Sequence, residues 1–181
     1  ANGSKCENFA FAADAPISAS LALGRDTAEE PRLYVADEGG TLYALDRDTG
    51  AIRWTFQADG PILSTPAVAT GGANDIIVFG ADVLGTISGS SLPVAVDGRV
   101  YAVRDDGATA TLLWTFDAGA SIGASSPSIN TDGTVYIGRA GQQLASGDQC
   151  AHGSGNPDVT CTVNVGGALY AIGAGAAAAS N

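Results

Sequence analysis

Short runs in which large apolar residues alternate with polar ones recur along the chain. The clearest is residues 52–56, Ile-Arg-Trp-Thr-Phe, in which every second side chain is large and apolar. Alternation at period two predicts a half-buried β-strand. The last three residues of this run recur twice, as Trp114-Thr115-Phe116 and, in weaker form, as Phe9-Ala10-Phe11. Each copy is followed by a short turn, an isoleucine and a run of small residues, which indicates an internal repeat.

Each repeat contains further strands joined by turn-forming residues. Residues 33–36 and 41–45 are short apolar runs, and the Asp-Glu-Gly-Gly segment between them predicts a hairpin because glycine accepts positive φ. Asp46 and Gly50 bracket the next turn, where an aspartate side chain can bond the backbone and a glycine closes the turn. Four short antiparallel strands with aromatic residues at fixed places are typical of a propeller blade.

Applied to all the repeats, this pattern predicts an all-β fold of three four-stranded blades in one domain, residues 1–181. The blades span about residues 17–57, 64–116 and 125–172. The expected strands are 18–23, 33–36, 41–46 and 53–57, then 64–68, 75–80, 99–104 and 111–116, then 125–129, 134–138 and 168–172. The last blade lacks its outer strand. We expect residues 9–12, with Phe9, Ala10 and Phe11, to supply it, in cis or from a neighbouring chain.

The run from Leu33 to Trp54 resembles the repeat of the pyrroloquinoline-quinone-type (PQQ-like) β-propeller family. That repeat has a Tyr-Val strand, an Asp-Gly turn, Leu-Tyr-Ala-Leu-Asp, Thr-Gly and then Trp, and the resemblance extends from about Phe9 to Ile172. It implies a propeller framework and specifies function weakly. The aromatic residues expected to pack blade against blade are Tyr43, Trp54, Phe56, Tyr101, Trp114, Phe116 and Tyr170.

Three blades fall short of the four to eight that usually close a propeller. Open end faces would expose apolar surface, and the incomplete third blade would expose a strand edge. We therefore expect the chain to bind copies of itself, as a six-bladed ring of two chains or as a head-to-tail filament, with residues 9–11 as the donor strand. A longer propeller of which this is a piece, and an unusually tight closed ring, are the alternatives.

The cysteines and the first residues favour an exported protein. The chain contains no methionine and begins Ala-Asn-Gly-Ser, which reads as a processed start after removal of a signal peptide. We expect an extracellular or periplasmic location, a disulfide between Cys150 and Cys161, and a leftover Cys6 that is free for an interchain bond. Pairing of Cys6 with one of the other two cysteines stays open.

Two insertions lengthen the middle hairpins of the second and third blades, at residues 83–95 and 140–165. Insertions at one corresponding place lie on one rim, where ligands often bind. Neither insertion contains Trp, Tyr or Phe, so a ligand- or carbohydrate-binding module ranks below a scaffold.

Charge and motifs point away from other functions. The net charge of −11 argues against nucleic acid, and no apolar run is long enough to span a bilayer. The single histidine, His152, could bind a metal with Asp148 or Asp158, but an imidazole in a polar loop is more often solvated. Residues 46–50 resemble the start of a calcium loop without its bidentate glutamate.

The family resemblance raises a quinone-dependent dehydrogenase as the competing function. Its active members are large closed propellers with a central cofactor, calcium and a catalytic carboxylate. We find no such constellation in this sequence. We therefore expect no catalytic, cofactor-binding or metal-binding residues and a non-catalytic scaffold or fibre subunit.

Overall fold

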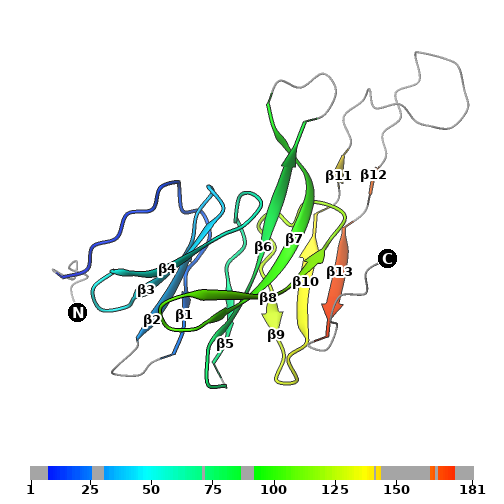
Figure 1. The fold of residues 1–181 in the computed structure, drawn as a ribbon. Helices are drawn as coiled ribbons and strands as arrows, with labels where there is room; N and C mark the ends of the chain where they lie inside the picture. Colours follow the sequence, from blue (N-terminus) through cyan, green and yellow to red (C-terminus); the bar gives the residue numbers. More distant parts are fainter. Residues whose placement is uncertain are drawn as a thin grey trace, which may run out of the picture.

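The structure, a computed structural model, describes residues 8–25, 31–70, 72–86, 92–140, 142–143, 164–165 and 167–173. These residues form strands, turns and extended segments, and no helix occurs among them. The predicted all-β class is confirmed to this extent. The strands build successive antiparallel sheets that follow one another along the molecule (Figure 1).

The first two sheets have four strands each, in chain order. The first sheet consists of β1 (Ala22–Leu23), β2 (Arg32–Ala36), β3 (Thr41–Asp46) and β4 (Ile52–Gln57). The second consists of β5 (Ala67–Ala69), β6 (Ile76–Gly85), β7 (Val94–Asp105) and β8 (Ala110–Asp117). Sequential strands joined by short turns are the meander expected of a blade.

The third sheet has three strands among the described residues: β9 (Ser128–Ile129), β10 (Val135–Arg139) and β13 (Ala168–Ile172), with β13 at one edge. A separate short ladder pairs β11 (Gln142–Gln143) with β12 (Asn164–Val165), at the start and end of the second predicted insertion. Cys6, Cys150, Cys161 and His152 lie outside the described residues, so the disulfide and the metal alternative stay predictions.

The repeat is visible in the strand register. Tyr43 lies opposite Thr55 in the first sheet, and Tyr101 lies opposite Thr115 in the second. The irregularity that follows is also shared, because the register shifts between residues 44 and 45 and again between residues 102 and 103. Similar sequence has therefore produced similar backbone geometry twice.

The turn after β3 explains the resemblance to a calcium loop. Asp46 Oδ1 accepts the backbone N–H groups of Asp48 and Thr49, at 3.1 and 2.9 Å, and Gly50 closes the turn with a φ of 76°. Hydrogen bonds from Arg53 and then Thr49 lower the pKa of Asp46 to about 2. Its carboxylate is thus engaged in a turn, as the repeat predicts.

Two strand predictions were wrong in extent. The inner strands are shorter than expected, because β1 begins only at Ala22 and β5 only at Ala67. The backbone N–H of Ser20 instead donates to Thr65 Oγ1 of the next blade at 3.2 Å, and that of Thr65 donates to Ser126 Oγ at 3.0 Å. The middle hairpin of the second sheet is longer than expected, since Ala81 pairs with Arg99 and the ladder continues to Gly85 opposite Val94. Both ends of the first predicted insertion, residues 83–85 and 94–95, are therefore strand.

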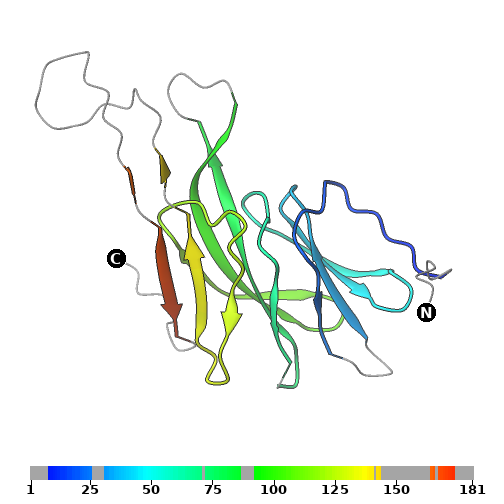
Figure 2. The ribbon, with the colours of Figure 1, turned by 180° about the vertical axis from the view of Figure 1, so that it is seen from behind.

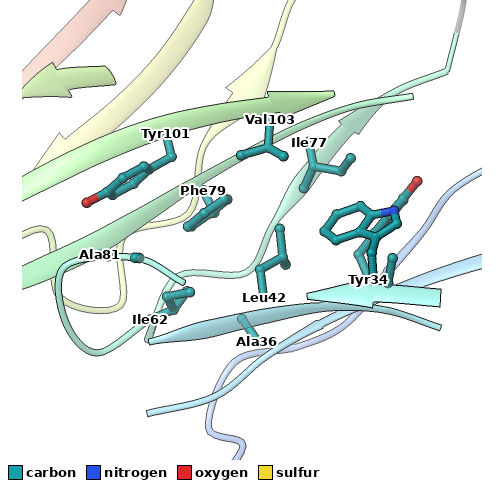
Figure 3. Close-up of a cluster of buried hydrophobic side chains, with 12 residues drawn as sticks. Tyr34, Ala36, Leu42, Ile62, Ile77, Phe79, Ala81, Tyr101 and Val103 are labelled. Atoms are coloured by element: carbon teal, nitrogen blue, oxygen red, sulfur yellow. The ribbon is translucent and has the colours of Figure 1, made fainter. Parts of the chain in front are cut away.

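The core consists of apolar clusters between sheets. Figure 3 shows the cluster between the first and second sheets, in which Leu42 of β3 faces Ile62 and Phe79. A second cluster joins the second and third sheets through Val100, Ile122 and Ile137. Each sheet thus packs face to face on the next, as blades of a propeller do.

Buried polar groups reinforce the contact between the first two sheets. Asp105, 5% exposed, accepts the Trp54 indole N–H at 2.9 Å and the Arg32 Nε–H at 2.8 Å. The Tyr34 hydroxyl lies 2.8 Å from Asp105 Oδ2 and 2.9 Å from Asp75 Oδ2. Burial, together with these two carboxylates, raises the pKa of Tyr34, so the hydroxyl stays protonated. A buried network that satisfies its members holds two elements in one relative position.

Candidate assembly interface

The N-terminal segment, residues 9–17, covers the outward face of the first sheet. Phe9, Phe11 and Ala13 pack on a cluster formed by Leu33, Val35, Tyr43 and Leu45. Burial alternates along the segment, with residues 9, 11 and 13 partly buried and residues 10, 12 and 14 exposed. The segment is thus extended and has one face on the sheet, as a strand would.

An aromatic contact shows what place the segment occupies. Phe11 meets Tyr43 edge to face at a centroid distance of 5.1 Å and an interplanar angle of 68°. The same pair recurs between the first two sheets and between the last two: Phe56 with Tyr101 at 5.9 Å and 67°, and Phe116 with Tyr170 at 5.0 Å and 64°. In the latter two pairs the phenylalanine belongs to the outer strand of one blade and the tyrosine to the next blade.

Hydrogen bonds repeat in the same way. The backbone N–H of Asp14 donates to the Tyr43 hydroxyl at 3.3 Å, as the N–H of Asp59 does to the Tyr101 hydroxyl at 3.2 Å. Two residues further along, another bond recurs at each of the three interfaces. It joins Glu38 N to Pro16 O at 2.8 Å, Asp82 N to Pro61 O at 3.0 Å, and Ala140 N to Ser121 O at 2.9 Å.

Residues 9–17 therefore bind the first sheet as residues 54–62 bind the second. They lie where the outer strand of a preceding blade would lie. In this structure they do not pair with β13 of the same chain, because the segment and β13 lie at opposite ends of the molecule (Figures 1 and 2). The sequence had left open that residues 9–12 complete the third sheet of their own chain, and the structure does not have this arrangement.

Exposure shows that, within the described part of the chain, no sheet covers either end face in the way that every internal face is covered. Leu169 of β13 is 75% exposed, while Leu42 and Val100 at the equivalent places of the first two sheets are 0% exposed. At the other end, Ile17 is 47% exposed, and its repeat equivalents Ile62 and Ile122 are 0% and 1% exposed. An aliphatic residue at the same repeat position is buried wherever a second sheet covers it.

Each end face has a further feature suited to a partner. Next to the segment lies an open apolar hollow of about 460 Å³, lined in part by Phe9, Phe11, Ile17 and Leu21. At the opposite end, β13 pairs with β10 on one side, and no described strand pairs with its other side. Exposed apolar surface and an unpaired strand edge both favour association.

The aromatic residues predicted to pack the blades lie at three faces. Trp54, Phe56 and Tyr101 lie between the first and second sheets. Trp114, Phe116 and Tyr170 lie between the second and third. Tyr43 lies under the N-terminal segment.

Sequence reasoning missed Ile17, Leu169 and Tyr136, which is 43% exposed, as end-face residues. The alignment of the repeats could have found them, because each is apolar or aromatic at a position that is buried in the other blades. The alignment alone does not show that these three residues are exposed, because exposure depends on which sheets cover them.

The described residues contain no group of three or more His, Cys, Asp or Glu side chains placed to hold a metal ion. Nor does that part of the chain include a helix that is long and apolar enough to cross a membrane.

A family model described as "Outer membrane protein assembly factor BamB" matches residues 10–151. The chain belongs to this PQQ-like propeller family. The resemblance seen in the repeats is thereby confirmed. Among solved structures, this BamB-family chain is similar to BamB from Moraxella catarrhalis at 17% sequence identity and a TM-score of 0.31, over 70% of this chain and 48% of that chain. It thus spans about half the length of that protein. No curated protein matches the chain.

Proposed function

We propose that this chain is a non-catalytic subunit that assembles with copies of itself through its two end faces, as a scaffold or fibre outside the cytoplasm. The observation that carries the proposal is the exposure of Leu169 at a position that is fully buried in both other blades. Burial of one such leucine contributes roughly 1.5–3 kcal/mol, and each end face offers several apolar side chains.

Strand donation is the second part of the proposal. The segment 9–12 is held extended on the first sheet, while the edge of β13 has no described partner. A neighbour's segment would complete the third sheet, and pairing of an edge strand is a common way of joining two chains. A second copy carries both the segment and the exposed edge, so it can cover the apolar faces and pair with this edge.

Location outside the cytoplasm is supported by the family's description, which names outer-membrane protein assembly. The non-catalytic assignment follows from the absence of a reactive constellation in the sequence. Dye-linked alcohol oxidation by the chain after addition of the quinone and calcium would overturn that assignment.

Light scattering and electron microscopy of the 181-residue chain test the assembly. We expect assemblies larger than one chain, and their loss when Leu169→Lys places a charge on the end face. Leu112→Lys is the matched control, since Leu112 on β8 is also exposed, at 47%, but lies on neither end face. A monomeric native chain, or equal loss of assembly in both variants, would refute the proposal.

A further inference from the structure

The two end faces of the molecule are complementary, and the internal interfaces show how they would meet. We propose that the contact between copies is head to tail and reproduces the chain's own blade-to-blade contact, residue for residue. This inference rests on the proposed self-assembly and goes further by specifying polarity, register and the residues that pair.

Polarity follows from the difference between the faces. One end carries the segment 9–17 on the first sheet, and the other carries the third sheet with β13 at its edge (Figure 2). Leu169 of β13 and Tyr136 of β10 are exposed on this third sheet. In each internal interface the outer strand of one blade packs on the face of the next blade. A copy that follows another in the same sense must therefore place its first sheet against the third sheet of the preceding copy. Such a contact joins two different surfaces and is heterologous.

The register follows from the two complete sheets. Between the third and fourth strands, Tyr43 lies opposite Thr55 and Tyr101 opposite Thr115, and Thr41 lies opposite Gln57 as Arg99 does opposite Asp117. Phe11 is the equivalent of Phe56 and Phe116 by its contact with the following tyrosine. The same register places Ala10 of one copy opposite Tyr170 of the preceding copy, and Ala12 opposite Ala168.

The pair at positions 12 and 168 has informative internal equivalents. Thr41 Oγ1 donates to Gln57 Oε1 at 3.2 Å, and Arg99 Nε donates to Asp117 Oδ1 at 2.6 Å, so the two side chains touch in both complete sheets. In the third sheet both positions are alanine, and Ala12 is exposed. These two sites can therefore carry cysteines without loss of a large side chain.

The inner strands supply an independent match. Ser20 N–H donates to Thr65 Oγ1 at 3.2 Å, and Thr65 N–H donates to Ser126 Oγ at 3.0 Å, so each blade donates to the hydroxyl of the next. The series continues across the proposed contact if Ser126 N–H donates to Ser20 Oγ of the next copy. Both ends of the chain hold the group that this bond requires.

When residues 9–12 pair with β13 of the preceding copy in this way, the segment stays packed on the first sheet of its own chain. Phe11 keeps its contact with Tyr43 of the same chain, and what the neighbour gains is the backbone edge of residues 9–12. The contact thus adds a strand to the preceding copy without removing a strand from the donor, unlike a domain swap.

A cysteine pair tests the register. In a Cys6→Ser background, Ala12→Cys and Ala168→Cys are made as separate single variants, mixed and oxidised. Opposed residues of antiparallel strands have Cα atoms about 4.5–5.5 Å apart, which suits a disulfide. The matched control mixes Ala10→Cys with Ala168→Cys. Residue 10 lies on the same side of the segment as residue 12, but it is two residues out of register with residue 168, a shift of about 7 Å along the strand.

We expect the mixture of the first two variants to form cross-linked dimers about tenfold more than the control mixture or either variant alone. Equal cross-linking in the control would overturn the register, and dimers from Ala12→Cys alone would overturn the head-to-tail polarity. Light scattering of the same samples separates the two proposals. Assembly without the expected cross-link refutes this inference alone, whereas monomers throughout refute the proposed function as well.

Discussion

Removal of one buried hydroxyl should measurably loosen the contact between the first two sheets. Tyr34 is 0% exposed, and its hydroxyl lies within 2.9 Å of carboxylate oxygens of Asp75 and Asp105. Tyr34→Phe keeps the ring, which packs near Trp54 at a centroid distance of 5.9 Å, and deletes only the oxygen and its proton.

The expected cost follows from the hydrogen bond that is lost. The hydroxyl has one proton and so donates to one carboxylate at a time. A hydrogen bond to a charged group contributes about 1.5–3 kcal/mol, and a cost of about 2 kcal/mol is expected because both carboxylates keep other donors. Asp75 still accepts the Arg25 N–H at 2.8 Å, and Asp105 still accepts the Arg32 and Trp54 N–H groups.

Urea unfolding followed by tryptophan fluorescence measures this cost. With a slope of about 2 kcal/mol per molar urea, the midpoint should fall by about 1 M. Tyr136→Phe is the matched control, because Tyr136 lies opposite Ala171 as Tyr34 lies opposite Ala44, yet it is 43% exposed. Its midpoint should stay within about 0.25 M, an effect typical of surface substitutions. A loss below about 0.5 kcal/mol in Tyr34→Phe, or an equal loss in the control, would refute this account of the network.

Two further substitutions test the turn and the repeat. Asp46→Asn should lower the free energy of unfolding at pH 7 by about 1 kcal/mol. The folded-state pKa of Asp46 is depressed to about 2, so its contribution is present above about pH 4 and disappears as the pH falls toward 2. A difference from the unsubstituted protein that persists at pH 2 in chemical denaturation would contradict this. Ile122→Ala should cost about 3 kcal/mol, because Ile122 is 1% exposed. Ile17 is its repeat equivalent and is 47% exposed, so Ile17→Ala should lower the free energy of unfolding of the isolated monomer by less than about 0.5 kcal/mol. Equal losses for the two substitutions in thermal or urea unfolding would mean that the end face around Ile17 is already covered.

Much of the fold was readable from a few neighbouring residues. The alternation in residues 52–56 and the Asp-Gly turns are local properties, and the strands β3, β4 and β8 lie within one or two residues of the predicted bounds. The strand edges that depend on distant partners were less accurate. The β6–β7 hairpin runs further than predicted because residues 94–98 find partners in residues 82–85, which no local pattern reveals.

For the candidate interface too, some features could be predicted from the sequence and others depended on the tertiary structure. The sequence by itself determined that residues 9–11 repeat residues 54–56 and that the third repeat lacks an outer strand, because a repeat needs only residue identity and spacing. Only the tertiary structure decided that Phe11 packs on Tyr43 of its own first sheet, and that Leu169 and Ile17 are exposed where their equivalents are buried. Burial depends on which surfaces meet across the whole chain. The sheets that the structure describes therefore bury the same repeat positions where they face one another and expose them at the two ends of the molecule.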